Sequence, residues 1–259
     1  MRRLFALPVA ALIVVSALII APLAAFADGG GRLSAVPWVF VGTTAQCSPS
    51  PAGSKIVTSA WLGGMGLPDN GGSNGASSTR NDPHRGLLLN KNGLTTDCSS
   101  SGATITGVKG KTVTATFELG YDYRNGGHCG AGAPRFNVDT DQGLYFVGCV
   151  NSVQSPAPQD AQWTRTRSVL TTCGSECFPG PIPVGAKING IDIVFDEGTD
   201  TASPSDPMGS GLAVLDNIDI NGKLITSGFG VQPGGGGRGD NNGEGGRHGH
   251  GDDGGGHGD

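Results

Sequence analysis

The stretch KTVTATFELGYDY, residues 111–123, alternates β-branched and aromatic residues with polar ones. A period of two is the pattern of a β-strand with one face buried and the other facing solvent. The same alternation recurs along the chain, whereas no stretch after the N-terminal region sustains the 3.6-residue period of an amphipathic helix. The pattern therefore predicts an all-β fold.

Seven further segments have strand character: 55–63, 85–91, 102–108, 143–150, 163–170, 188–197 and 211–220. Glycine-containing turns are expected between them, at 125–127, 141–143, 189–190 and 221–222. Short strands separated by glycine and proline favour an antiparallel β-sandwich of the jelly-roll kind. We expect this sandwich to occupy residues 28–232.

The N-terminus has the features of a secretory signal peptide. Arg2 and Arg3 precede a long apolar run, and residues 25–27 read Ala-Phe-Ala, a small-x-small cleavage site. The run approaches the length of a membrane span, so an uncleaved anchor is the alternative. We expect residues 1–27 to be removed on export, which leaves a secreted chain with no further membrane segment.

The C-terminal residues 233–259 differ in composition from the rest of the chain. From Gly234 onward they contain Gly, Asp, Asn, Glu, Arg and His and no apolar residue. Such a segment cannot bury enough surface to offset its conformational entropy, so we expect a disordered tail. Its histidines could bind a transition metal loosely, but a solvated spacer is the favoured interpretation.

The charge balance argues against nucleic acid as a partner. The 17 Lys and Arg residues are outnumbered by 22 Asp and Glu, a formal net charge of −5, and signal cleavage would remove two of the arginines. An acidic chain has no electrostatic footprint for phosphate backbones or anionic lipids.

Six cysteines in an exported chain predict three disulfides. The short spacing favours a local Cys173–Cys177 bridge. A second bridge is expected across a hairpin, Cys129–Cys149, which leaves the pair Cys47–Cys98.

The segment GGHCGAGAPRFNV, residues 126–138, has three interpretations. Cys129 beside His128 could be a thiol nucleophile, the glycines could cradle a phosphate, or the segment could be a turn fixed by a disulfide. The oxidising compartment and Pro134, which prevents a helix from starting, favour the turn. Arg135 is then expected to bind a carboxylate or backbone carbonyls nearby.

Acidic side chains raise two possibilities for chemistry. A structural calcium ion could be bound by Asp139 and Asp141 in a turn, or by Asp196 with Asp216 on neighbouring strands. Asp216 falls among apolar residues and must be paired if it is buried, with Arg135 as one expected partner. A glycosidase would instead need two facing carboxyl groups, drawn from Asp196, Glu197 and Asp216.

Aromatic rings could form a platform for sugar rings. The candidates are Trp38, Trp61, Trp163, Tyr121, Tyr123 and Tyr145. Most aromatic residues in a small sandwich belong to the core. Trp61 lies next to a long polar loop and Trp163 opens a strand after a proline-rich linker, so these two are the ones expected to be exposed and to bind ligand.

The segment GLAVLDNIDING, residues 211–222, resembles the final strands of jelly-roll carbohydrate-binding modules. Together with RGLLLNKNG, GGHCGAGAPRFNV and YFVGC, it is similar to uncharacterised secreted β-sandwich proteins of bacteria. The resemblance covers about residues 85–222. It implies a sandwich and possible recognition of an extracellular polysaccharide, and it transfers no ligand-binding residue.

The sequence therefore leaves three functions open. The favoured one is a secreted or surface-associated binding protein, with extracellular glycan as its expected ligand. The alternatives are a secreted glycosidase that uses an Asp/Glu pair, and a structural protein of the cell envelope or matrix.

Overall fold

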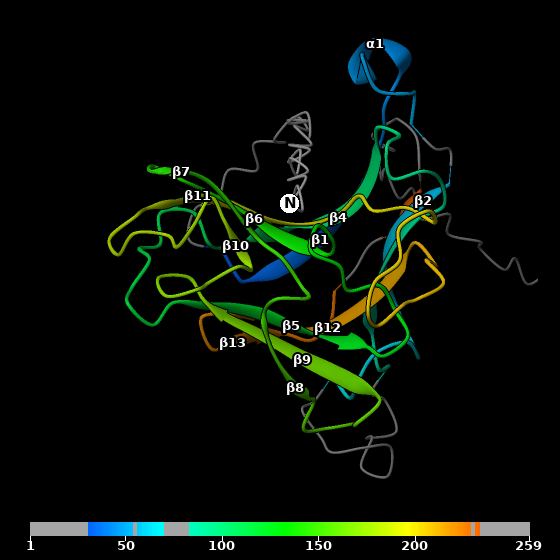
Figure 1. Ribbon diagram of the computed structural model, residues 1–259. Coiled ribbons are helices and arrows are strands. Elements are labelled where there is room, and N and C mark those ends of the chain that lie inside the picture. The colour runs from blue at the N-terminus through cyan, green and yellow to red at the C-terminus, as the bar shows by residue number, and fades with distance from the viewer. Residues whose placement is uncertain (1–30, 54–55, 70–82, 229–230, 234–259) are drawn as a thin grey trace, which may run out of the picture.

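The computed structural model describes residues 31–53, 56–69, 83–228 and 231–233. Its strands form two antiparallel sheets that pack face to face (Figure 1), which confirms the all-β sandwich. The expected signal peptide and the tail from residue 234 onward lie outside these residues. The described part of the chain contains no helix that is long and apolar enough to cross a membrane.

The first sheet has six strands in the order β1-β4-β11-β6-β7-β10. Their bounds are β1 Ser34–Val41, β4 Ser99–Thr106, β11 Ile188–Phe195, β6 Arg135–Thr140, β7 Gly143–Val147 and β10 Cys177–Phe178. All neighbours are antiparallel, and β11 carries an irregularity between Ile188 and Gly190. The Asn189-Gly190 pair, expected as a turn, is this bulge instead.

The second sheet has eight strands, of which seven follow the order β14-β2-β3-β12-β5-β9-β8. Their bounds are β14 Val231–Pro233, β2 Val57–Leu62, β3 Gly86–Lys91, β12 Leu212–Ile220, β5 Glu118–Arg124, β9 Trp163–Val169 and β8 Val153–Pro156. The eighth strand, β13 (Lys223–Ile225), pairs with the end of β12.

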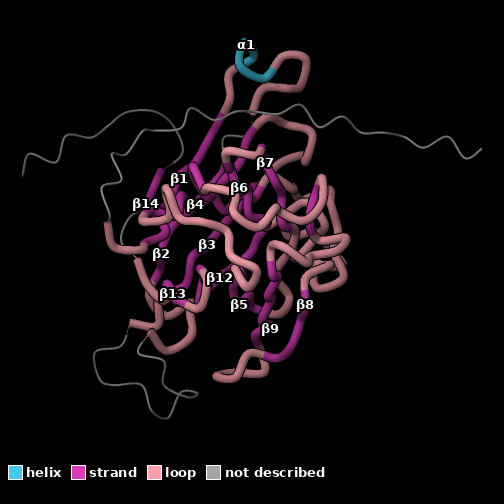
Figure 2. The backbone as a smooth tube through the Cα atoms, turned by 90° about the vertical axis from the view of Figure 1, so that its left-hand side faces the viewer, coloured by secondary structure: helices cyan, strands magenta, loops and turns pink. Residues whose placement is uncertain are grey.

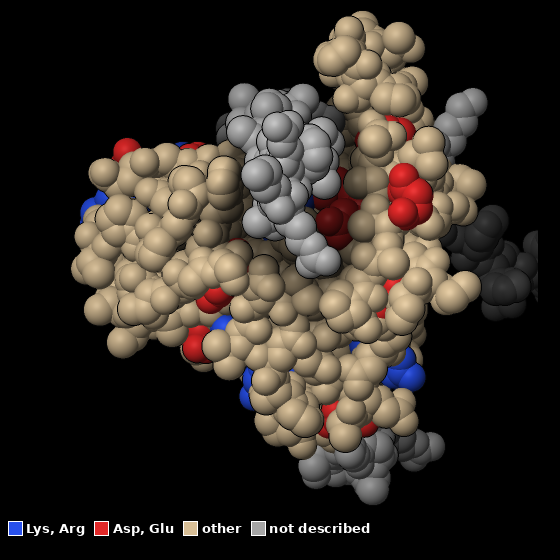
Figure 3. All heavy atoms as spheres, in the orientation of Figure 1, with Lys and Arg blue, Asp and Glu red and all other residues tan. Residues whose placement is uncertain are grey.

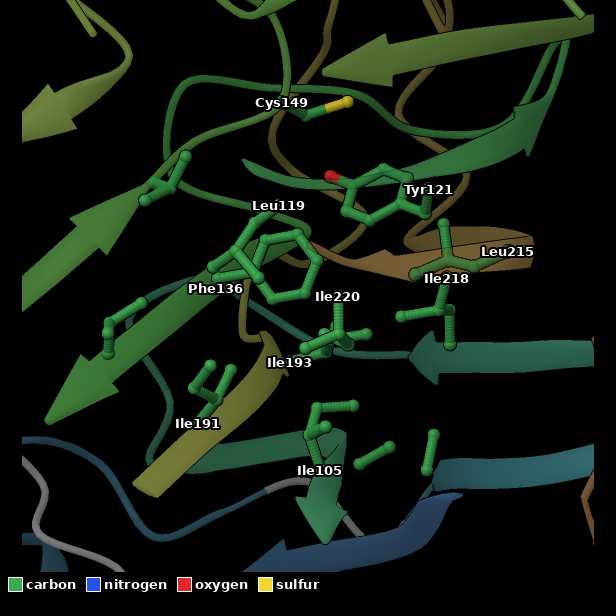
Figure 4. Packing of buried hydrophobic residues seen from close by; sticks show 14 of the residues in the cluster. Ile105, Leu119, Tyr121, Phe136, Cys149, Ile191, Ile193, Leu215, Ile218 and Ile220 are labelled. Atoms are coloured by element: carbon green, nitrogen blue, oxygen red, sulfur yellow. The ribbon is translucent and has the colours of Figure 1, made fainter. Parts of the chain in front are cut away.

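The core lies between the two sheets. Leu119 and Tyr121 of β5 meet Phe136 of β6 and Ile193 of β11 (Figure 4), and all four side chains are at most 2% exposed. The Tyr121 and Phe136 rings are 5.5 Å apart, and the Tyr121 hydroxyl donates to the carbonyl of Pro134 at 2.7 Å. Burial of each such side chain contributes about 1.5–3 kcal/mol, so the inward face of the alternation holds the sheets together.

Strand β12 departs from strict alternation because it contains a bulge. Its pairing with β5 shifts between Asp216 and Asp219, and Asn217 has a φ of 44°. The extra residue resets the pattern, so that Leu215 and Ile218 both belong to the core. A strict period of two over 211–220 predicts Leu215 and Ile218 on opposite faces, and the bulge makes that prediction wrong.

One predicted strand is shorter in the structure, and one observed strand was not predicted. Of the stretch 111–123, only the part from Glu118 is in β5, and Val113 and Phe117 are buried in irregular backbone. Strand β1, on the other hand, was not predicted, although SAVPWVFV alternates in burial over its first four residues.

The three disulfides join the pairs expected from spacing: Cys47–Cys98, Cys129–Cys149 and Cys173–Cys177. They indicate that the chain folds in an oxidising compartment. The first of them fastens α1 (Thr44–Cys47), which projects beyond the strands at one end of the molecule (Figure 2), to the start of β4.

Candidate functional site

The two tryptophans expected to form an exposed platform are both buried. Trp61 is 2% exposed and points between the sheets, where its Nε1 donates to the carbonyl of Ala35 at 2.9 Å. Trp163 is 1% exposed and packs with Leu67, Ala157 and Val214. The prediction that they are exposed is wrong, because segments distant in sequence cover both rings.

The predicted calcium pair Asp196 and Asp216 is not brought together. Asp196 follows β11 in the six-stranded sheet, whereas Asp216 belongs to β12 in the eight-stranded sheet. The Asp196 carboxylate binds Arg135 through two hydrogen bonds of 2.6 and 2.8 Å, and its carbonyl accepts from the Lys91 ammonium at 2.8 Å. Protein cations therefore take the place predicted for calcium at Asp196, and Arg135 pairs with Asp196 rather than with Asp216.

The other predicted pair lies where expected, at the turn between β6 and β7. Asp141 accepts from the backbone N–H of Lys187 at 2.8 Å, and Asp139 is half-buried. No group of three His, Cys, Asp or Glu side chains in the described ranges is arranged to hold a metal ion. Calcium binding stays a prediction.

The outward-pointing side chains of β3, β12, β5 and β9, together called the eight-stranded face, form a covered charge network. Asp122 is fully buried and binds Arg165 at 2.9 and 3.1 Å. Its second oxygen also accepts from the side-chain amide of Asn217 at 2.8 Å, and Arg167 lies 3.5 Å from the first. Every strong charge here has a partner within the protein.

Asp216 lies on the same face and is 1% exposed. Its two oxygens accept backbone hydrogen bonds from Leu67 at 2.7 Å and Asn217 at 2.6 Å. Burial raises the pKa of Asp216 to about 8, because desolvation outweighs these two hydrogen bonds. The segment around Leu67 thus covers this carboxyl group, and the Asp216 side chain is not accessible to a ligand.

The segment GGHCGAGAPRFNV is organised around Glu197. His128 is fully buried, and its Nε2 lies 2.5 Å from Glu197 Oε2. A Cβ added at Gly130 or Gly132 would come within 2.5 Å of the Glu197 carboxylate, so a side chain at either position would displace Glu197 from its place beside His128. Cys129 is in a disulfide, which excludes the thiol nucleophile, and Arg135 binds a carboxylate as predicted.

The outward-pointing side chains of the six-stranded sheet, here called the six-stranded face, are different because many of them are half-exposed. Strand register places one residue from each strand in a continuous row across the sheet: Val36, Thr104, Asp192, Asn137, Phe146 and Phe178. The neighbouring row contains Trp38, Gly102, Val194 and Arg135. Directly paired residues point to the same side, so both rows share one surface.

Trp38 lies flat against the sheet at one end of this face. A Cβ at the paired residue Gly102 would come within 2.4 Å of Trp38 Cζ2 and 2.2 Å of the carbonyl oxygen of Ile193, so only glycine allows the ring to lie there. Thr104 donates to the Asp192 carboxylate at 2.6 Å. Burial raises the pKa of Asp192, and the neighbouring Thr104 hydroxyl and Trp38 indole offset only part of this rise.

Phe146 and Phe178 close the other end of the face. Their rings stack with centroids 6.3 Å apart, and Phe178 is 68% exposed. The guanidinium of Arg135 lies 5.6 Å from the Phe146 ring centroid, which fixes both groups. Four inter-strand spacings separate Trp38 from Phe146, about 19 Å along the sheet at roughly 4.8 Å each.

No protein-family model, curated protein or solved structure matches the chain. The geometry of the chain itself is therefore the basis for proposing a function.

The six-stranded face is hollowed and carries both aromatic and polar side chains. In Figure 3 the molecular surface is hollowed where Figure 1 places β1 and β4, and acidic side chains lie at the base of the hollow. Aromatic rings at two ends, with hydroxyl, carboxylate and amide groups between them, can stack against flat apolar surfaces and hydrogen-bond polar groups at once. No reactive thiol accompanies them, because the described chain has no free cysteine.

Trp38 is one of the six aromatic candidates, but the sequence pattern favoured Trp61 and Trp163, which are buried. Trp38 lies on β1, a strand that was not predicted. The alternation of SAVPWVFV would have placed Trp38 and Phe40 on the side opposite Ala35, and an edge strand leaves one of its sides less covered. Tyr121, Tyr123 and Tyr145 are buried in the core.

Proposed function

We propose that this protein is an exported binding protein that holds an extracellular glycan across the six-stranded face. The observation that carries the proposal is the placement of Trp38 and the Phe146–Phe178 stack toward opposite ends of one sheet face, with the polar residues Thr104, Asp192 and Asn137 between them. Ligand sites of this kind combine apolar contact area with a few fixed polar groups.

Each part of the face has a role in this proposal. The flat Trp38 ring stacks against the C–H face of a sugar ring, as aromatic side chains do with other apolar surfaces. Asp192 accepts from sugar hydroxyls with the oxygen that Thr104 does not occupy, and the Asn137 amide both donates and accepts. The length of the row suits a chain of several sugar units rather than a single one.

The glycosidase alternative has less support. Asp196 is held by Arg135 and Glu197 by His128, so neither carboxylate is free to face the other across a substrate. Asp216 lies in the other sheet. A purely structural envelope protein remains the competing proposal, and binding measurements separate it from the glycan-binding one.

Affinity electrophoresis through gels that contain soluble polysaccharides tests the proposal, together with co-sedimentation with insoluble ones. We expect the wild-type protein to be retarded by at least one polysaccharide and Trp38→Ala to lose most of that retardation. Val153→Ala is the matched control, because Val153 is 73% exposed on β8 of the other sheet. Equal retardation of Trp38→Ala and wild type, or no retardation in any gel, would contradict the proposal.

A further inference from the structure

We infer that the six-stranded face selects uncharged glycans and rejects acidic ones. This inference rests on the proposed function and concerns the class of ligand that the same face accepts. It follows from the charges on the six strands and from how each of them is already paired.

The six strands contain a single Lys or Arg residue, Arg135. Its guanidinium donates to Asp196 Oδ1 at 2.6 Å and Oδ2 at 2.8 Å, to the carbonyl of Gly132 at 2.7 Å, and to Asn137 Oδ1 at 3.0 Å. Four of its five N–H groups are therefore in use. Arg135 has no two-pronged donor left with which to bind the carboxylate of a uronic acid or a sulfate group.

The carboxylates on the same face are not neutralised in this way. Asp192 accepts a hydrogen bond from the uncharged hydroxyl of Thr104, and no ion pair to Asp192 or Asp139 occurs among the described residues. The half-buried position of Asp192 between two aromatic ends weakens the screening of its charge by water. An acidic polymer would have to approach this charge without a compensating cation.

An uncharged sugar is not repelled by the Asp192 carboxylate. Its hydroxyl groups donate to Asp192 and exchange hydrogen bonds with Asn137, and bonds to a charged acceptor are stronger than neutral ones. Its C–H faces stack on Trp38. The same carboxylate that repels an acidic sugar thus strengthens the binding of a neutral one.

The test compares polymers that share a backbone and carry either neutral or acidic substituents. Suitable pairs are hydroxyethylcellulose with carboxymethylcellulose, and methyl-esterified with de-esterified homogalacturonan, each in affinity gels at low salt. We expect the neutral member of any bound pair to bind at least tenfold more tightly than the acidic member. We also expect the ratio to fall when 0.5 M NaCl screens the charges.

The variant Asp192→Asn assigns the selectivity to one residue. Asparagine keeps an oxygen that can accept from Thr104 and removes the charge, so we expect the neutral-to-acidic ratio to fall several-fold. Asp141→Asn is the matched control, because it makes the same charge change at an exposed turn, and we expect it to leave the ratio unchanged.

The outcomes distinguish the two proposals. An acidic member that binds as tightly as its neutral partner, or a ratio that Asp192→Asn leaves unchanged, overturns the inference and leaves glycan binding in place. A protein that binds no polymer in either pair and none in the wider polysaccharide panel overturns the proposed function and the inference with it.

Discussion

The outer faces of the two sheets have opposite characters although similar alternation produces both. On the eight-stranded face, Asp122, Asp216 and Asn217 are at most 1% exposed and bonded within the protein. On the six-stranded face, Asp192 and Trp38 are half-exposed. On the eight-stranded face the segment around Leu67 packs over Asp216 and Trp163, and two arginines of β9 pair with Asp122. A polar strand face becomes a site or a scaffold according to what packs on it.

Trp163→Ala should cause the largest loss of stability among the substitutions that compare the two faces. The ring is 1% exposed in the small cluster with Leu67 and Val214, so its removal leaves a cavity and should cost about 3–5 kcal/mol of unfolding free energy. Urea denaturation followed by circular dichroism measures this. A loss below about 1 kcal/mol would show that the eight-stranded face is not packed as described.

Asp122→Ala should cost about 3 kcal/mol, because it leaves Arg165 and Arg167 without their shared buried partner. Both arginines keep some contact with water, which holds the cost at the lower end for a broken buried ion pair. The matched control is Asp139→Ala on the six-stranded face, for which we expect a change within about 0.5 kcal/mol. Similar losses for the two variants would remove the contrast between the faces.

Trp38→Ala should affect ligand binding more than stability, unlike the two substitutions on the eight-stranded face. We expect the affinity for a bound glycan to fall at least tenfold, about 1.4 kcal/mol, while the unfolding free energy falls by only about 1 kcal/mol, since the ring is half-exposed. Isothermal titration calorimetry and urea denaturation of the same preparation measure the two quantities. A large loss of stability with unchanged affinity would place Trp38 among the structural residues.

The ionisation of Asp216 should make the stability of the fold change gradually with pH. Its pKa is raised in the folded state to about 8 from an ordinary value of 3.8, so the unfolded chain releases this proton first as pH rises. The group therefore stabilises the fold below about pH 4, and this contribution is lost between about pH 4 and 8, by on the order of 1 kcal/mol per pH unit. Asp216→Asn cannot ionise, so its unfolding free energy should fall less steeply than that of wild type across this window, although its amide nitrogen cannot accept one of the two backbone hydrogen bonds. Parallel pH curves for the two proteins would contradict this.

Much of the fold could be predicted from local sequence, because strand alternation and cysteine spacing are local signals. The eight predicted strand segments each overlap an observed strand, and the three disulfides are those expected. The binding of Arg135 to a carboxylate was also predictable, since a glycine-rich crossing leaves room for its guanidinium beside the end of β11.

The candidate site could not be predicted in the same way. Whether Trp38 or Trp163 is exposed depends on which distant segment covers each ring, and neither alternation nor composition carries that information. The bulge at Asn217 had a similar effect, because one extra residue moves every following side chain of β12 to the other face. The packing of distant segments and the strand register determine which side chains are exposed, whereas the local alternation of residues determines the strands.

The most direct measurement is a backbone amide NMR titration with a neutral oligosaccharide from the polymer that the protein binds. The account predicts chemical-shift changes confined to residues 34–40, 100–104, 135–139, 144–146, 177–178 and 192–194, which lie on β1, β4, β6, β7, β10 and β11. Changes centred on residues 86–90, 118–124 and 163–169 instead would place the ligand on the eight-stranded face and contradict the account.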